Sequence, residues 1–561
     1  MSAMTIDPRP AAIVSLINAL ERKFPRRAVS ATDRRTVIPF EVSPKVSFEY
    51  KENIGIVAIA QEDISAAEDC LIALPQEGTL SVQNDVYKSA EFTSLDSETT
   101  FILKNIVSQC KGKFDLLAMQ GKFEALASNT LTLSILAMYA IADTEGHFAK
   151  HVLPTWPPLE EMKNHSLYWG SEELSAITST YAHSRIIQNQ KELRLAFDNV
   201  VFNVLHKQQI SHHFVPSDEN RSDDVLPDNV SLWNAFKYSF AVCTSRSHDG
   251  EFGCAEIHPL IDLFNGLPEQ LGASINVELH LIDGSTSNSY HLYSTRGIAK
   301  GEELFISYGV IPGSGFVAKY GVMPLQMLDS KNNIVEPLML WYPPSLAPDP
   351  SNSKLLKALK NVGYPASVQE LASGFGFQLS PDMLTHYSSQ INGVGSTISD
   401  PNYHEPDELK SLRQYLILAK VADDKAIELN LTTGRLKGDF DTTKIGKFLV
   451  KVVDYNLGKF KSENTSTEDL ALIEGGSLTE RMKNALRVRI NYRESLLILR
   501  HAICRRYGSA SFMDAGFNDE EAPKCLGDNG CTCCGRTVKV MACKGCSGSV
   551  AYCNRAHQKL H

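Results

Sequence analysis

The order of the predicted elements constrains the fold of this chain more than any other sequence feature. Three β-like runs come first, a stretch from about 97 to 210 then shows the apolar period of helices, and β-like runs return afterwards. Because the strands of one sheet lie side by side, we expect both β portions to meet in space across a helical insertion. The predicted fold class is α+β. The runs are Val46–Tyr50, Ile54–Ala60, Cys70–Pro75, 276–283, 290–295 and 304–308.

Helices are further predicted at Ala11–Arg22, at 230–247 and over about 352 to 505. With 561 residues, 43% of them hydrophobic and 21% charged, the chain is predicted to be globular, with about three to four domains. Charges sum to 55 − 65 = −10, which excludes a polyanion binder as a whole and does not favour nucleic acid as a partner.

The longest mainly apolar stretch, Leu131 to Ile141, is shorter than the roughly 20 residues of a membrane-spanning helix, so no membrane partner is expected. The first residues also lack the continuous apolar core of a secretory signal. We therefore expect the cytoplasm or the nucleus, with the plastid left open.

The twelve cysteines fall into two groups. Five are scattered and are predicted to be buried reduced thiols (Cys70, Cys110, Cys243, Cys254 and Cys504). Seven lie between Cys525 and Cys553, where two C-x₂-C pairs precede a C-x₃-H. This spacing is typical of a zinc site, because tight turns deliver pairs of thiolates to a tetrahedral ion. A disulfide set is the rival interpretation, and the lack of a secretory signal disfavours it.

Three segments of the β portions combine Gly, Asn and acidic residues with apolar runs. Each has a plain structural interpretation when taken alone: Gly55 as a hairpin glycine, Asn265-Gly266 as a turn, and Tyr308 as a core residue at a strand end. Arg246 can likewise pair with an acid, and Asp262 can cap a helix. The segments are Glu52–Ala58, Ser245-Arg246 with His258–Gly266, and Gly301–Gly309.

In order and spacing these segments resemble the SET-domain protein methyltransferases, in the branch of the Rubisco large-subunit lysine methyltransferase. The matches are Asn53–Ala58, Ser245-Arg246, Pro259–Gly266, Gly301–Gly309 and Tyr320–Val322, with Leu153–Trp156 in the insertion and Thr465–Leu470 and Ala485–Arg489 in a later helical domain. Asn53 replaces a family Gly, and Asn tolerates a left-handed backbone. Gly266 replaces a family His that packs beside the cofactor, so we expect a thinner pocket wall.

The resemblance implies methyl transfer from S-adenosyl-L-methionine to a lysine of a protein substrate. It implies Tyr308 as the catalytic residue at the transfer point. Arg246, Asp262 and Tyr320 match substrate positions. Cofactor positions are matched by Glu52, Asn53, Ile54, Arg246, Asn265 and Gly266.

The cysteine cluster resembles a MYND finger, a module that binds protein partners. The implied Zn²⁺ ligands are Cys531, Cys534, Cys543, Cys546, Cys553 and His557. His557 stands where the family usually has Cys, and no counterpart of the family's last His-x₃-Cys follows in this sequence. We therefore expect one tightly held zinc ion at Cys531, Cys534, Cys553 and His557, and a weaker one at Cys543 and Cys546.

The predicted organisation is an extension over 1–45, a SET-like domain over 46–325 with its insertion at about 97–225, a helical substrate-binding domain over 340–510 and the finger over 525–561. The leading hypothesis is a lysine methyltransferase with a zinc-binding interaction module. Two alternatives stay open: a catalytically weak SET-fold scaffold, and a protein-histidine methyltransferase.

Overall fold

The structure is a computed structural model of the chain. It describes residues 7–25, 40–51, 55–66, 70–82, 97–123, 125–206, 208, 210–215, 229–249, 254–269, 274–282, 288–309, 311–323, 338–341, 343, 376–379, 442–507, 541–542 and 551–552. The chain divides into two compact units. Unit 1 comprises 1–169, 185–310 and 317–322, and unit 2 comprises 170–184, 311–316 and 323–561.

The strands of unit 1 confirm the predicted β portions on both sides of the insertion. They are β1 (Glu41–Val42), β2 (Val46–Lys51), β3 (Gly55–Ala60), β4 (Cys70–Pro75), β5 (Leu80–Ser81), β6 (His248–Asp249), β7 (Ala255–Ile257), β8 (Asn265–Leu267), β9 (Val277–Ile282), β10 (Ser289–Ser294) and β11 (Phe305–Ser307). The runs of β3 and β4 are almost wholly buried, as their continuous apolar sequences predict.

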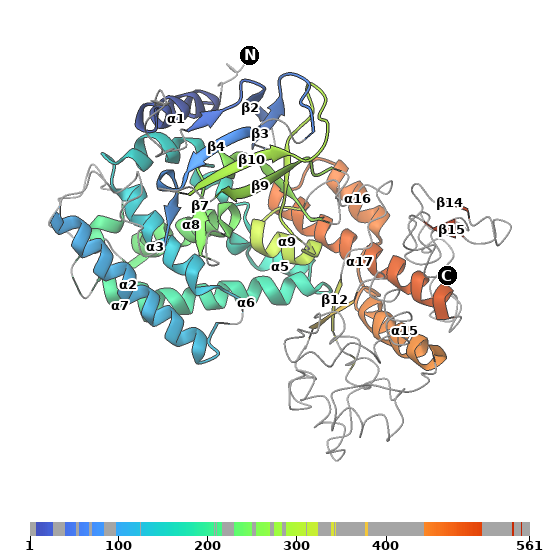
Figure 1. Cartoon of the computed structure of the whole chain (residues 1–561). Coiled ribbons are helices and arrows are strands. Elements are labelled where there is room, and N and C mark those ends of the chain that lie inside the picture. The colour runs from blue at the N-terminus through green and yellow to red at the C-terminus, as the bar shows by residue number, and fades with distance from the viewer. Residues whose placement is uncertain are drawn as a thin grey trace, which may run out of the picture. The chain divides into compact units, whose positions relative to one another are not determined.

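The two β portions do meet in space, as expected. The largest sheet has the order β1-β4-β10-β9, in which β4 of the first portion pairs antiparallel with β10 of the second (Figure 1). Antiparallel bridges also join Ile59 to Glu303 and Ile64 to Ile298. Elsewhere β2 pairs with β3, β5 with β7, and β8 runs parallel to β11. Backbone pairing therefore joins the strands of the second β portion to those of the first.

The helical insertion is also confirmed. Its helices and helical turns are α2 (Ser97–Met119), α3 (Ser128–Ala142), η3 (Phe148–Val152), η4 (Leu153–Thr155), α4 (Leu159–Met162), η5 (Ser166–Tyr168), α5 (Ser171–Ala176), α6 (Tyr181–Ala196), η6 (Phe197–Val201), α7 (Phe202–Leu205) and η7 (Ser211–Phe214). Before it lies α1 (Arg9–Lys23), and after it α8 (Asn229–Arg246), η9 (Ile261–Leu263) and α9 (Gly313–Tyr320).

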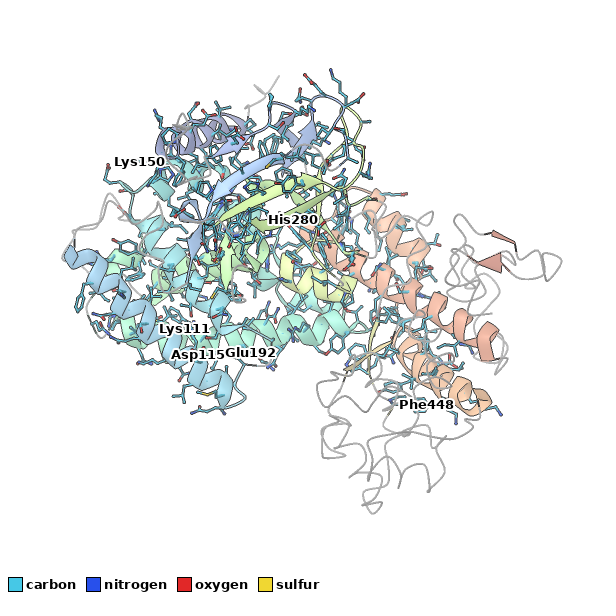
Figure 2. All side chains as sticks on the ribbon, in the orientation of Figure 1. Lys111, Asp115, Lys150, Glu192, His280 and Phe448 are labelled. Atoms are coloured by element: carbon cyan, nitrogen blue, oxygen red, sulfur yellow. The ribbon has the colours of Figure 1, made fainter. Side chains whose placement is uncertain are left out.

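Helix α3 is the centre of the insertion, because its residues from Leu131 to Ala140 are buried on every face. It packs between α2 and α8. The buried carboxylate of Glu192 accepts hydrogen bonds from the backbone N–H groups of Ala125 and Leu126, and so fixes the turn that leads into α3. Figure 2 labels Glu192 on α6 and, on α2, Lys111 and Asp115. Lys111 Nζ lies 2.8 Å from Asp115 Oδ2, so these two residues form an ion pair.

Unit 2 is mainly helical within its described residues. It contains α15 (Thr442–Gly458), α16 (Ser466–Glu474), α17 (Glu480–Tyr507) and the strand pairs β12 (Leu338–Trp341) with β13 (Gly376–Leu379) and β14 (Met541–Ala542) with β15 (Ala551–Tyr552). A capping box of Thr465 and Glu468 begins α16.

One part of the predicted helical region is wrong. Residues Gly376–Leu379 form β13, not helix, and pair antiparallel with Leu338–Trp341 of β12. The physical reason is that Phe377 and Leu379 alternate with polar or small residues, which suits a strand once a partner strand is present. Among the described residues no helix is long and apolar enough to cross a membrane.

Candidate active site

Tyr308 lies at the end of β11, where this short strand runs parallel to β8. The register places Ile306 opposite Gly266 and Ser307 opposite Leu267, and the backbone N–H of Tyr308 donates to the Leu267 carbonyl at 2.9 Å. Asn265 and Gly266 therefore belong to a strand, and the alternative that they form an ordinary turn is wrong.

The ring of Tyr308 folds back over Gly266. A Cβ atom at position 266 would lie 2.0 Å from Cε1 and 2.2 Å from Cζ of Tyr308, which is far inside van der Waals contact. The ring of Tyr308 also stacks on that of Tyr320, with centroids 4.4 Å apart and planes 19° apart. The ring of Tyr308 thus occupies the space that a side chain at position 266 would fill, whereas the expected thinner wall of the cofactor pocket stays a prediction.

Arg246 and Asp262 form a pair close to Tyr308. Arg246 Nη1 donates to the Asp262 backbone carbonyl at 2.9 Å and lies 3.3 Å from Asp262 Oδ2. Trp156 Nε1 donates to the same Oδ2 at 3.0 Å. The Asp262 side chain is 1% exposed and that of Arg246 is 18% exposed, so only the arginine side chain of this pair reaches solvent to any extent. Asp262 lies within η9 and does not cap a helix.

Burial is the largest influence on the pKa values of Tyr308 and Asp262. It raises the pKa of Tyr308 to about 12, while the charges of Arg246 and Asp262 act on the phenol in opposite senses. Tyr308 therefore keeps its proton at neutral pH and can donate a hydrogen bond. Burial also raises the pKa of Asp262, against the opposing effect of Arg246. One oxygen of this carboxylate, Oδ1, has no hydrogen-bond partner in the described part of the chain.

Glu303 contacts Lys51 of the first β portion and Asn265 of the second. Its Oε1 accepts a hydrogen bond from Asn265 Nδ2 at 2.8 Å, and its Oε2 lies 3.6 Å from Lys51 Nζ. Lys51 ends β2 and stands opposite Gly55 in the hairpin. The predicted cofactor residues Glu52, Asn53 and Ile54 lie outside the described residues, so their place beside β8 stays a prediction.

The backbone is strained next to Asp262. Leu260, two residues earlier, has φ +74°, and it is the one non-glycine residue with positive φ among those the structure describes. Such a conformation costs an L-residue about 1–2 kcal/mol and persists only where the surroundings impose it. Leu260 is fully buried, so core packing holds this turn and directs Asp262 towards Arg246.

Two residues of the site escaped prediction from the sequence. Trp156 was noted only as part of a motif, yet it is a direct hydrogen-bond donor to Asp262. Glu303 lies inside the Gly301–Gly309 segment but no role was assigned to it. A buried Trp needs an acceptor for its N–H, and this need was the one available signal for Trp156.

The predicted zinc ligands cannot be placed. Cys531, Cys534, Cys543, Cys546, Cys553 and His557 all lie outside the described residues, so the zinc site stays a prediction. Within the described residues no group of three or more His, Cys, Asp or Glu side chains is arranged to hold a metal ion. Of the scattered thiols, Cys110 and Cys243 are buried as predicted, whereas Cys70 and Cys254 are half-buried. The side chain of Cys504 lies outside the described part of the chain.

Neither a protein-family model nor a curated protein matches the sequence. Solved structures do match the fold. The SET domain of LSMT bound to lysine and AdoHcy aligns with a TM-score of 0.54 at 12% identity, over 92% of this chain and 96% of that chain. Rubisco LSMT bound to AdoMet aligns with a TM-score of 0.51 at 15% identity, over 88% of this chain and 92% of that chain. The chain therefore has the fold of these SET-domain structures.

Proposed function

We propose that this chain is an S-adenosyl-L-methionine-dependent protein methyltransferase that acts on a lysine side chain. The observation that carries the proposal is that Arg246, Asp262, Gly266 and Tyr308, from three segments of the sequence, lie close together in a SET-like fold. Structures of this fold are described with lysine or monomethyllysine and with AdoMet, AdoHcy or sinefungin bound.

The described residues fit such a cofactor in two respects. The side chain of Asn265 is already bonded to Glu303, so Asn265 and Gly266 would offer backbone groups of β8. Gly55 has φ +95° and open space around the position of a Cβ, which leaves room for a ligand beside the Glu52–Ile54 segment. When bound, S-adenosylmethionine supplies the methyl group.

The residues of this chain would prepare the acceptor. A lysine amine must be neutral to act as a nucleophile, and with a pKa near 10.4 roughly one in a thousand is neutral near pH 7. A surrounding that excludes water raises that fraction, and the buried ring of Tyr308 would supply part of one. The Arg246–Asp262 pair adds no net charge when Asp262 is ionised, so it orients the acceptor without stabilising the ammonium. The neutral Tyr308 hydroxyl would hold the groups at the transfer point.

Titration calorimetry with S-adenosylmethionine tests the proposal. We expect saturable heat and a rise in the unfolding temperature, because a ligand that binds the folded state stabilises it. Tyr308→Phe should keep this binding and lower turnover on the true substrate at least about tenfold, since it deletes one hydroxyl from the transfer point. Absence of heat and of thermal shift at millimolar cofactor would instead favour the scaffold alternative. Amino-acid analysis of the methylated product separates lysine from histidine as acceptor.

We further propose the domain bounds 46–325, 340–510 and 525–561, with the last as a zinc-binding module that contacts a protein partner. The strand pair of β14 and β15 supports this module, since the two strands end at the residues before Cys543 and Cys553. Metal analysis of protein purified without added zinc should return about one tight ion per chain, in a Cys₃His set. Two equally tight ions would overturn the one-site assignment. Chelation should abolish partner binding and leave unit 1 folded.

A further inference from the structure

A second polar cluster lies buried next to the candidate site. It consists of Ser81, Glu256, His258 and Tyr290, and we name it the Glu256 cluster. The Glu256 carboxylate accepts hydrogen bonds from Tyr290 Oη at 2.6 Å and Ser81 Oγ at 2.8 Å, and His258 Nε2 lies 3.2 Å from Oε2. Glu256 and His258 are fully buried. Burial opposes the ionisation of Glu256, but hydrogen bonds led by that of His258 hold its pKa below the usual value.

The chemistry of the cluster fixes the tautomer of His258. An ionised carboxylate only accepts hydrogen bonds, so Nε2 carries the proton that faces Glu256. The ring plane is fixed as well, because His248 stacks on one side at 5.2 Å between centroids and Tyr290 stacks at 3.9 Å. The second ring nitrogen, Nδ1, is buried and has no hydrogen-bond partner among the described residues.

His258 and Asp262 belong to one turn. The Asp262 backbone N–H donates to the His258 carbonyl at 2.9 Å. Each side chain carries one buried polar atom without a partner in the described structure, His258 Nδ1 and Asp262 Oδ1. A buried polar atom left unsatisfied costs about 1–3 kcal/mol, and a buried water with two or more polar partners removes that cost.

We propose that His258 is a positioning residue for the candidate acceptor site: anchored on Glu256 through Nε2, it holds Asp262 Oδ1 through one buried water at Nδ1. The role of Asp262 towards an acceptor rests on the proposed function, whereas the contacts of His258 with Glu256 and Asp262 do not. Oδ2 is already bound by Trp156 and Arg246, so the water fixes the remaining oxygen and with it the plane of the carboxylate. The Glu256 cluster thereby acts on the orientation of Arg246 indirectly, through the position of the Asp262 carboxylate.

Two substitutions of His258 distinguish the roles of its two ring nitrogens, Nε2 and Nδ1. His258→Gln keeps an amide N–H that reaches Glu256 and loses the acceptor at Nδ1. His258→Asn keeps a polar group near Nδ1 and is too short to reach Glu256. Tyr290→Phe is the matched control, because it removes another donor to Glu256 and leaves Asp262 untouched.

The readout is the indole N–H resonance of Trp156, which donates to Asp262 Oδ2 and therefore senses any rotation of that carboxylate. It is assigned by its loss in Trp156→Phe, with the full chain as sample. We expect a shift larger than the line width in His258→Gln, a smaller one in His258→Asn and none in Tyr290→Phe, although all three lower the unfolding midpoint. An unchanged resonance in folded His258→Gln would overturn the proposal.

A crystal structure of the unmodified chain is a second test that does not depend on how the variants fold. Density for a water within hydrogen-bond distance of both His258 Nδ1 and Asp262 Oδ1 is expected, and other partners for these two atoms would contradict the proposal. The proposed function fails separately, through the absence of S-adenosylmethionine binding by the unsubstituted chain. If that binding exists, His258→Gln should lower turnover while the cofactor dissociation constant changes less than about twofold, as expected of a residue that acts only on the acceptor side.

Discussion

Each unit of the molecule contains a buried Arg–Asp pair, and the two pairs are built differently. In unit 2 the Arg489 guanidinium binds both oxygens of Asp469, with Nε 2.7 Å from Oδ2, and a third donor comes from Asn464. In unit 1 Arg246 approaches one oxygen of Asp262 at 3.3 Å, and the other oxygen has no partner in the described structure.

The difference indicates two roles. A bidentate pair with its remaining positions satisfied is a structural joint, here between α16 and α17. The Arg246–Asp262 pair has one long contact, an oxygen without a partner in the described structure and a partly exposed arginine side chain, as the proposed function expects of a site pair.

Arg489→Met should be the most damaging change. It leaves the buried Asp469 carboxylate without its bidentate partner, and breaking a buried pair costs about 3–5 kcal/mol. Urea denaturation that follows the transition of unit 2 measures the loss. Arg489→Lys, which restores the charge but not the fork geometry, should recover only part of it. A loss below about 1 kcal/mol in Arg489→Met would remove the contrast between the two pairs.

Acid should weaken unit 1 through His165. This ring is fully buried; Nε2 lies 3.0 Å from the Lys319 carbonyl and Nδ1 accepts from the Leu167 N–H, and burial lowers its pKa to about 4. The unfolded chain, with an ordinary pKa near 6.5, binds the proton first. Stability is therefore full above pH 6.5 and falls by about 3 kcal/mol as the pH drops to 4.

Denaturation of unit 1 at pH 7 and pH 4.5 checks this expectation. His165→Gln, which cannot titrate in this range, should show a shallower dependence on pH than the unsubstituted chain. Equal slopes for the two proteins would mean that His165 is not held neutral by the fold.

Gly266→Ala should destabilise unit 1 by about 1–3 kcal/mol, the usual cost of an added methyl group in a packed region. The reason is the 2.0 Å approach of that methyl to Tyr308, whose ring must leave its stack on Tyr320. Gly112→Ala in α2 is the matched control: its Cβ meets nothing within 4 Å, and helix propensity predicts a gain of up to about 1 kcal/mol. Equal effects at both positions would show that Tyr308 does not need the space above Gly266.

Arg246→Met should have the smallest effect on stability, about 1–2 kcal/mol, when it is measured at pH 5. Burial already raises the pKa of Asp262, so the carboxyl can take up a proton when its partner is lost. The loss in the free energy of unfolding should grow as the pH rises, because keeping the buried Asp262 carboxyl protonated in the folded state then costs more. Unfolding midpoints of this variant at pH 5 and pH 8 test the sign. A cost equal to that of Arg489→Met would assign both pairs the same structural role.

Sequence patterns alone determined the longer strands and the helical insertion, but not the short strands β1, β5, β6, β7 and β8. Alternation and helical periodicity are local properties, so the bounds of β4 were predicted residue for residue and those of β2, β9 and α8 to within a residue or so. The motif segments also singled out Arg246, Asp262 and Tyr308, which the structure brings together.

Only the tertiary structure decided which side chains touch. That the ring of Tyr308 fills the space above Gly266, that Trp156 donates to Asp262, and that Glu303 joins Asn265 to Lys51 all depend on packing between segments far apart in the chain. The strand at Gly376–Leu379 was missed for the same reason, since a short strand is stable only with its partner. Periodicity shows which face of an element is buried, but the partner on that face is set by the folded chain.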